Sequence, residues 1–335
     1  MIRNIVFLVL VFIISACSKN KPSSEGKAKS LTYVSIDLLE SLGIYTIDAP
    51  VREFEGDYFI LDRSQQKVAR VDDSFAAVKC FFDLQESITD DNEVFGFDIL
   101  GDRLFLRSLS GFTVFNLRTN ALLGFHRNPF PLTQQLIAGA QSYYTTRFSR
   151  AGLEVVSFKW DDDQGFHSVS TIAEIPNSRN VIEIDQSGWL FAMDAYLVYL
   201  DEWSGEYYVM DSSKKKIITK GRLPFSGPIE ENYEVDEDGF SFGTYKNAYS
   251  VSVSSPNTFW ALREVDWEIS ESADIDLEKE SDRKRIRRRV HHFNANMELI
   301  DSYVLAEIGN CIFYHDGKLF VNHTGSEKVY VYALD

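Results

Sequence analysis

The sequence predicts an all-β fold, a six-bladed β-propeller closed by its N-terminal strand, and three observations support this. A short pattern of an acidic or polar residue, a glycine and an aromatic-rich strand occurs six times. Polar turns separate further apolar runs at a second recurring position. The chain ends on a strand without a following partner, while a spare strand is present near its start. Recurrence at this period is typical of arrays of similar supersecondary units.

The repeat glycines predict the hairpin between the two inner strands of each blade, because glycine tolerates the positive φ of a tight turn. They are Gly56, Gly101, Gly139, Gly188, Gly239 and Gly317. Their spacings are 45, 38, 49, 51 and 78 residues, and a four-stranded blade takes about 40–50 residues. The last interval contains the charge-dominated stretch 268–289. We interpret this stretch as a loop inserted in the fifth blade; a seventh blade in the same interval is the alternative.

A second set of polar breaks predicts the hairpin between the two outer strands of five blades. The breaks fall at residues 72–74, 116–120, 161–165, 211–214 and 294–296. The sixth blade has no such break, because the chain stops after a third strand at 328–334. Residues 31–36 are expected to supply the fourth strand. This closure matters because it removes strand edges that otherwise pair with other chains.

The first 17 residues carry an export signature. A basic residue, Arg3, precedes ten apolar residues at 5–14, about half of what spans a bilayer as a helix. Small residues then precede Cys17. This stretch resembles the signal peptide and lipobox of bacterial lipoproteins. The resemblance implies cleavage before Cys17, acylation of its thiol by chains such as palmitate, and anchoring to the cell membrane or outer membrane. An ordinary secretory signal cut near Ala16 is the alternative.

The domain organisation follows from this signature. Residues 1–16 are the predicted signal peptide, and 17–30 are a lipidated tether, since 18–30 contain no large apolar side chain. Residues 31–335 are expected to form a single propeller domain. The remaining cysteines, Cys80 and Cys311, lie in apolar runs, so we expect buried free thiols.

The repeat layout of 31–335, with the strand pair in 318–331, resembles the six-bladed propeller lipoproteins of Bacteroidota. The resemblance implies an exported, envelope-bound domain and rests on no catalytic signature. A net charge of −16 argues against nucleic acid, because nucleic-acid binding depends on cationic groups. The expected partners are therefore the membrane, through the lipid anchor, and an envelope protein or glycan.

Four acidic residues lie three positions before repeat glycines and are expected to line the central channel. They are Glu53, Asp98, Asp185 and Asp236. Equivalent positions of a ring meet around one axis, so these carboxylates could together hold Ca²⁺, which prefers six to eight oxygen ligands. Hydrogen bonds from each acid to its own turn are the favoured interpretation. No motif for another cofactor is present, so the sequence favours no cofactor, with Ca²⁺ as the exception to test.

The sequence favours a binding or scaffold module that acts through its loops over an enzyme. It contains no nucleophile elbow and no glycine-rich phosphate loop. The alternative is a metal-assisted hydrolase or lyase at the channel mouth.

Two loop features are candidate partner contacts. Trp203 lies in a predicted loop, where an exposed aromatic side chain is able to anchor a partner. The second is a basic run that contains Arg283, Arg285, Arg287, Arg288 and Arg289. Cross-strand pairing of this run with the preceding acidic residues is the favoured interpretation.

Overall fold

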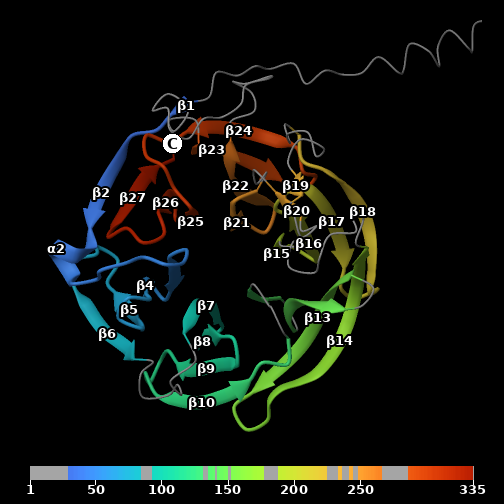
Figure 1. Ribbon diagram of the computed structural model, residues 1–335, viewed down its shortest axis with the longest axis horizontal. Coiled ribbons are helices and arrows are strands. Elements are labelled where there is room, and N and C mark those ends of the chain that lie inside the picture. The colour runs from blue at the N-terminus through green and yellow to red at the C-terminus, as the bar shows by residue number, and fades with distance from the viewer. Residues whose placement is uncertain are drawn as a thin grey trace, which may run out of the picture.

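The computed structural model describes residues 29–83, 93–130, 135–139, 142–149, 152–176, 188–224, 233–235, 241–243, 248–265 and 286–334. Six small antiparallel sheets are arranged in a ring around a central axis (Figure 1). The predicted six-bladed β-propeller is therefore confirmed, and the described sheets include no seventh blade. No helix among the described residues is long and apolar enough to cross a membrane.

The first three blades follow one another along the chain, each from its innermost to its outermost strand. Blade 1 contains β3 (Arg52–Phe54), β4 (Asp57–Asp62), β5 (Lys67–Val71) and β6 (Val78–Asp83). Blade 2 contains β7 (Val94–Leu100), β8 (Arg103–Ser108), β9 (Gly111–Asn116) and β10 (Leu122–Arg127). Blade 3 contains β11 (Leu136–Ala138), β12 (Tyr143–Ser149), β13 (Gly152–Asp161) and β14 (Gly165–Pro176).

The other three blades complete the ring, and a separate hairpin precedes blade 5. Blade 4 contains β15 (Gly188–Met193), β16 (Tyr196–Asp201), β17 (Glu206–Asp211) and β18 (Lys216–Arg222). The separate hairpin contains β19 (Tyr233–Val235) and β20 (Ser241–Gly243). Blade 5 contains β21 (Ser250–Ser255), β22 (Thr258–Val265), β23 (Ile286–Asn294) and β24 (Leu299–Val304). Blade 6 contains β25 (Cys311–His315), β26 (Lys318–Asn322), β27 (Lys328–Ala333) and the N-terminal strand β2 (Tyr33–Asp37).

Strand β2 closes the ring as predicted. It pairs antiparallel with β27, with Tyr33 opposite Tyr332 and Asp37 opposite Lys328. The helix α2 (Leu38–Leu42) follows at once, because the Asp37 side chain accepts a hydrogen bond from Glu40 N and so caps the first turn. Gly43 ends the helix at φ 68°, and the chain then enters blade 1.

A short strand, β1 (Lys29–Ser30), lies parallel to β24 at the outer edge of blade 5. Lys29 is opposite Tyr303 in this pairing. The N-terminal segment therefore approaches the ring along the outside of blade 5 before it completes blade 6 (Figure 1).

All five predicted outer hairpins are present, and their first residues share one mechanism. In each turn the side-chain oxygen of the first residue accepts hydrogen bonds from backbone amides two to four residues further on. Asp211 Oδ1, for example, accepts from Ser213 N and Lys214 N at 3.0 Å each. The other four residues are Asp72, Asn116, Asp161 and Asn294. A short acceptor side chain at this position stabilises a turn without help from the rest of the fold.

The glycine pattern is correct for four blades and wrong for two. Gly56, Gly101 and Gly317 occupy inner turns at positive φ, and Gly139 lies between β11 and β12. Gly188 is instead the first residue of β15, where a Cβ would come within 2.6 Å of Leu200 O. Gly239 falls between β19 and β20, outside the blades.

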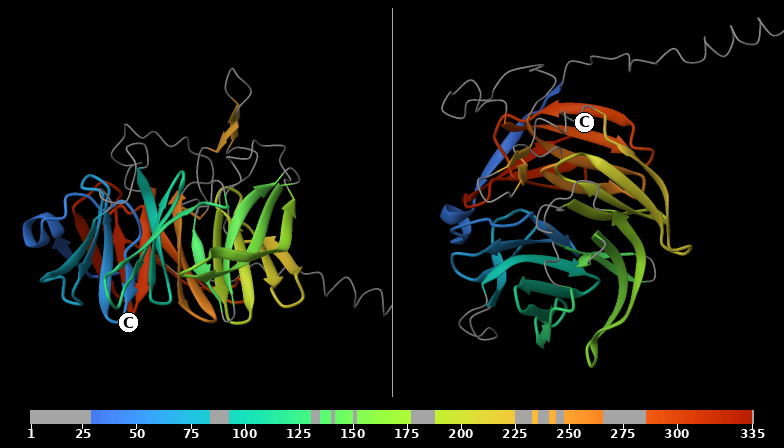
Figure 2. Two further views of the ribbon diagram at one scale, coloured as in Figure 1. Left: turned by 90° about the horizontal axis from the view of Figure 1, so that it is seen from below. Right: turned by 45° about the vertical axis from the view of Figure 1, so that its right-hand side comes forward.

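The chain from the end of blade 4 to the end of blade 5 consequently contains two insertions rather than one. The first surrounds the β19–β20 hairpin between blades 4 and 5, and the second lies between β22 and β23 within blade 5. Every innermost strand starts from the same face of the ring, which we call the connection face, because the chain enters each blade there. The β19–β20 hairpin projects from this face (Figure 2, left).

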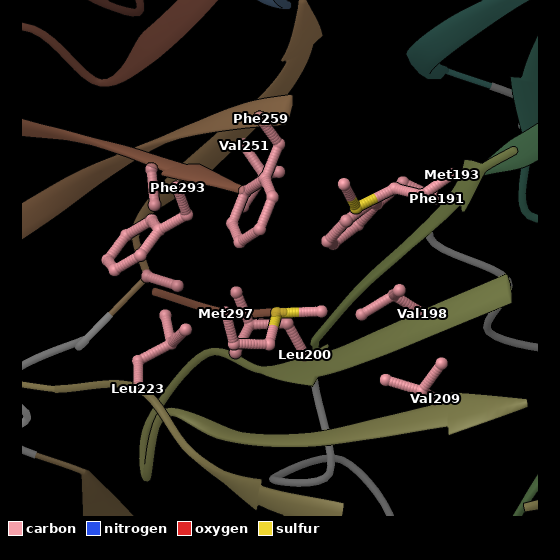
Figure 3. Packing of buried hydrophobic residues seen from close by; sticks show 12 residues of the cluster. Phe191, Met193, Val198, Leu200, Val209, Leu223, Val251, Phe259, Phe293 and Met297 are labelled. Carbon is pink, nitrogen blue, oxygen red and sulfur yellow. The ribbon is translucent and has the colours of Figure 1, made fainter. Parts of the chain in front are cut away.

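Large apolar side chains fill the spaces between neighbouring blades. Between blades 4 and 5, Phe191 packs on Phe259 with ring centroids 4.9 Å apart, and Phe259 packs on Phe293 at 5.2 Å (Figure 3). Met297 and Leu200 complete this layer. Aromatic packing of this kind joins the blades into a rigid scaffold around the axis.

The two cysteines of the propeller are both free thiols, but only Cys311 is buried; Cys80 is partly exposed. Burial raises the pKa of the Cys311 thiol to about 11, so the reactive thiolate is scarce at neutral pH. We expect iodoacetamide at pH 7.5 to modify Cys80 well before Cys311 in the mature chain with Cys17→Ser. Peptide mapping by mass spectrometry checks this. Equal labelling of both thiols in the folded protein would contradict the described burial.

Candidate functional site: the central channel

The central channel contains a cavity of about 310 Å³, and all six innermost strands contribute to its wall. Most of the lining is apolar or aromatic. It includes Ile99, Ile137, Trp189, Phe191, Val251 and Phe313. The few polar lining side chains are Arg52, Asp98, Gln135 and Ser252. An apolar wall with a few polar groups, at the lower end of the usual size range, is typical of small-molecule sites.

Asp98 is one of the two described carboxylates on the innermost strands. Its carboxylate is already bonded to other groups of the protein. Its Oδ2 atom accepts a hydrogen bond from Leu136 N of blade 3 at 3.0 Å. The same oxygen lies 3.1 Å from Arg107 Nε. Gly96 makes this ion pair possible, because a Cβ there would lie 2.5 Å from the Arg107 guanidinium. Asp98 therefore links blades 2 and 3.

Similar links between side chain and backbone join the other blades around the channel. Blade 3 is bonded to blade 4, blade 5 to blade 6, and blade 6 to the segment before blade 1. The bonds run from Gln135 Nε2 to Leu190 O, from Ile312 N to Ser250 Oγ, from Tyr314 N to Ser252 Oγ and from Asn322 Nδ2 to Ala49 O. Trp189 Nε1 also donates to Ala248 O at 2.9 Å. These bonds fix the positions of the strands that form the cavity wall.

Glu53 behaves as the favoured sequence interpretation expects. Its Oε1 accepts a hydrogen bond from Gly56 N of its own inner turn at 2.7 Å. Its Oε2 lies 3.7 Å from His315 Nδ1 of blade 6. Glu53 does not appear in the cavity wall, so it stabilises a turn at the channel rim.

Asp185 and Asp236 lie outside the described residues, but the strand order shows that they are not equivalent to Glu53 and Asp98. Asp185 precedes β15, and Asp236 lies between the two strands of the β19–β20 hairpin. The innermost strands of blades 4 and 5, β15 and β21, contain no acidic residue. The expected ring of four carboxylates on the innermost strands is therefore wrong, because it depended on Gly188 and Gly239 as inner turns.

The described residues do not fit a calcium site. They contain no group of three or more His, Cys, Asp or Glu side chains placed to hold a metal ion. Asp98 forms an ion pair with a guanidinium, and Glu53 accepts a hydrogen bond from a backbone amide. A carboxylate engaged in this way is a poor ligand for a second cation.

Arg52 is the polar residue that the sequence interpretation missed. It is half-buried at the start of β3 and lines the cavity. Its Nη1 donates one long hydrogen bond, 3.5 Å, to the neighbouring Val51 O. Burial lowers the pKa of the Arg52 guanidinium, Asp98 raises it, and Arg107 lowers it further. Arginine at the first position of a predicted channel-lining strand was the available signal.

The two candidate partner contacts are placed differently. Trp203 lies half-buried in the turn between β16 and β17, on the connection face. Arg283 and Arg285 lie outside the described residues, and Arg287 and Arg288 belong to β23. Arg289 is 7 % exposed and donates a hydrogen bond to Ser302 Oγ, so it is not available to a partner.

A buried basic cluster lies near Arg289 in blade 5. Arg263 is directly opposite Arg289 in the β22–β23 pairing, and His291 follows on the same face of β23. All three side chains are buried. Burial, followed by repulsion from Arg263 and Arg289, lowers the pKa of His291 well below its ordinary value. The neighbouring His292 points the other way and stacks on Trp260 with ring centroids 4.2 Å apart.

The buried neutral His291 predicts a loss of stability in mild acid. Below about pH 6.5 the unfolded chain binds a proton at this histidine that the folded chain does not bind. The free energy of unfolding should therefore be constant above pH 7 and fall below 6.5 by up to about 1.4 kcal/mol per pH unit for this group. His126 and His292, whose pKa values burial also lowers, act in the same direction.

Urea unfolding at pH 7.5 and 5.5 measures this dependence, and His291→Gln should reduce it. The carboxyl groups with lowered pKa, such as that of Asp162, lose their contribution only below about pH 4. They therefore do not mask the effect. An unfolding free energy that is equal at the two pH values would contradict the prediction.

The comparisons with known proteins extend to the fold alone. No protein-family model matches the chain, and no curated protein matches it. Among solved structures, a Bacteroides fragilis protein described as exported has a TM-score of 0.54 at 9% identity, over 90% of this chain and 94% of that one. Virginiamycin B lyase from Staphylococcus aureus has a TM-score of 0.53 at 10% identity, over 91% of this chain and 100% of that one. The Pan2 WD40 domain of Neurospora crassa has a TM-score of 0.51 at 9% identity, over 91% of this chain and 96% of that one.

Proposed function

We propose that this chain is a lipid-anchored envelope protein whose propeller is a binding module, with its ligand site in the central channel. The observation that carries the proposal is the cavity, which is lined by the innermost strands of all six blades. Its wall combines apolar and aromatic side chains with an arginine that has no ion-pair partner among the described residues. Bonds between blades hold these strands in place, so the site is formed before a ligand arrives.

Location in the envelope rests on the lipobox that ends at Cys17. Two or three acyl chains on one cysteine anchor a domain stably where a single chain does not. The similarity to an exported Bacteroides fragilis protein supports the same location and a relationship to the six-bladed propeller lipoproteins of Bacteroidota. An envelope protein or glycan is the proposed larger partner. Trp203 and the arginines before Arg289 are its proposed contacts at the connection face.

The alternative of a metal-assisted hydrolase or lyase has less support from the site. Asp98 and Glu53 are already bound by protein groups, which leaves this alternative dependent on Asp185 and Asp236. The likeness to a lyase extends to the fold alone. A binding site is therefore the better explanation of the cavity.

Site-specific photocrosslinking in living cells tests the proposal. Benzoylphenylalanine is placed at Ala138, which is exposed at the cavity wall, or at Leu122 on the outer rim as a control. We expect irradiation to add a defined mass to the protein from position 138 and not from position 122. Equal adducts at both positions, or none at 138, would overturn the channel as the site.

A separate fractionation tests the anchor. Wild-type protein should sediment with membranes, and Cys17→Ser should lose the acyl modification seen by mass spectrometry of the N-terminal peptide. An unmodified Cys17 in the wild type would overturn the lipid anchor and leave the channel proposal untouched.

A further inference from the structure

The cavity wall carries fewer negative charges than the sequence predicts, and it includes an arginine. Within the described part of the chain, the innermost strands carry two carboxylates, and only Asp98 lines the cavity. Arg107 is already paired with Asp98, at 3.1 Å. The second guanidinium near Asp98, that of Arg52, is left with one long bond to a carbonyl. Arg52 and Asp98 are the only charged side chains that line the cavity within the described residues, and Asp98 is already bonded to Arg107 and Leu136 N, so the Arg52 guanidinium is the charged group left for a ligand.

Apart from Asp98, the group that would act as a counter-ion of Arg52 is Cys311. It does not supply a negative charge. Its thiol interacts electrostatically with Arg52. Burial nevertheless raises the pKa of Cys311 to about 11, so the thiol stays neutral at physiological pH. Arg52 itself remains cationic, since arginine is protonated at any physiological pH. The half-buried Arg52 guanidinium makes only one long hydrogen bond to the protein, so most of its N–H donors are left for an anion brought by a ligand.

The other lining side chains indicate the chemistry of the remainder of the ligand, which we call its body. Among the partly exposed lining residues, Trp189 and Phe313 offer aromatic surfaces, and Ile99, Ile137 and Val253 offer aliphatic ones. Ser252 is occupied by Tyr314 N, and Gln135 donates to Leu190 O. Each of these side chains already uses one hydrogen-bonding group within the protein, while an apolar or aromatic body gains by leaving water beside the apolar lining side chains.

We propose that the channel binds a small ligand with one carboxylate and an apolar body, and that Arg52 binds the carboxylate. This inference rests on the proposed function and specifies its ligand class. The guanidinium presents paired N–H donors that match the two oxygens of a carboxylate. The aromatic side chains enclose the apolar body. Two sources share this chemistry, a free small acid and the C-terminal carboxylate of a peptide that ends in an apolar residue.

Calorimetric titration of the mature chain with Cys17→Ser tests the inference without detergent. The probes are 3-phenylpropionate, 3-phenylpropanol and 3-phenylpropylammonium, which share a body and differ in charge. We expect the acid to bind at least about tenfold more tightly than the alcohol, as a charge-assisted hydrogen bond requires, and more tightly still than the amine. N-acetyl-Ala-Phe with a free or an amidated C-terminus then distinguishes the two sources. Binding of the free peptide assigns the carboxylate to a chain end, and binding of phenylpropionate alone assigns it to a small acid.

Arg52→Met should abolish the preference for the acid, and Arg52→Lys should retain part of it. Arg127→Met is the matched control, because Arg127 is exposed on the outermost strand of blade 2 and its loss removes the same charge far from the cavity. Melting temperatures of the three variants verify folding.

Three results overturn the inference: equal binding of acid and alcohol by the wild type, an acid preference that survives Arg52→Met, or no binding of any probe. Binding of acid and alcohol alike, lost in Ala138→Trp, refutes only the charge preference and leaves the channel as a binding site.

Discussion

We expect that removal of strand β2 destabilises the fold of this protein and that the chain no longer remains monomeric. A chain of residues 38–335 lacks the strand that pairs with β27 over five residues. The edge of β27 is then open, and the Ile36 contact with the layer between blades 6 and 1 is lost. With each ladder bond contributing about 1 kcal/mol net, the loss is on the order of 5 kcal/mol. That is a large part of the 5–15 kcal/mol that stabilises a typical domain.

A matched control separates the closing strand from the mere shortening of the chain. Tyr33 is opposite Tyr332, so residues 31–37 fused directly after Asp335 form a short hairpin with β27. This rearranged chain should recover a monomeric elution volume and most of the melting temperature of the 31–335 chain. Size-exclusion chromatography and circular dichroism measure both. A stable monomer of 38–335 alone would show that β2 is dispensable for closure.

Asp98→Ala is expected to be the most destabilising single substitution at the channel. Asp98 is 2 % exposed and is bonded both to Arg107 and to Leu136 N. Its removal leaves a buried guanidinium without this carboxylate, which typically costs about 3–5 kcal/mol. Urea unfolding measures the change in the unfolding free energy.

Glu93→Ala is the control for Asp98→Ala. Glu93 pairs with Arg63 at 2.6 Å, but its side chain is 64% exposed, and exposed pairs contribute about 0–1 kcal/mol. Equal effects of the two substitutions would mean that Asp98 does not link blades 2 and 3. Asp98 would then return to the set of residues available to a ligand.

The fold was predictable from the sequence because its turns depend on local chemistry. Asp211 and the four residues equivalent to it stabilise their turns with their own side chains, so each turn is visible in a short window. The closing strand followed from counting strands. The inner turns of blades 4 and 5 were missed because they contain no glycine. Blade 4 turns at Asp194, which adopts φ 50°, and the turn of blade 5 lies between Ser255 and Thr258.

The site was predicted less well, because its chemistry depends on contacts between distant segments. The pairing of Asp98 with Leu136 N spans 38 residues, and no local pattern shows that Gly96 makes room for Arg107. Because the carboxylate of Asp98 is already bonded, Arg52 is the charged lining side chain left for a ligand among the described residues. The residue was visible beside Glu53, but its role follows only from the arrangement of β3, β7 and β8 around the channel.

Native mass spectrometry of the lipidated protein purified from its own envelope tests the central claim most directly, that the channel is a ligand site governed by Arg52. Wild-type protein and Arg127→Met should carry the same additional mass of a small molecule, and Arg52→Met should lack it. The same mass on all three proteins, or on none, would contradict the claim.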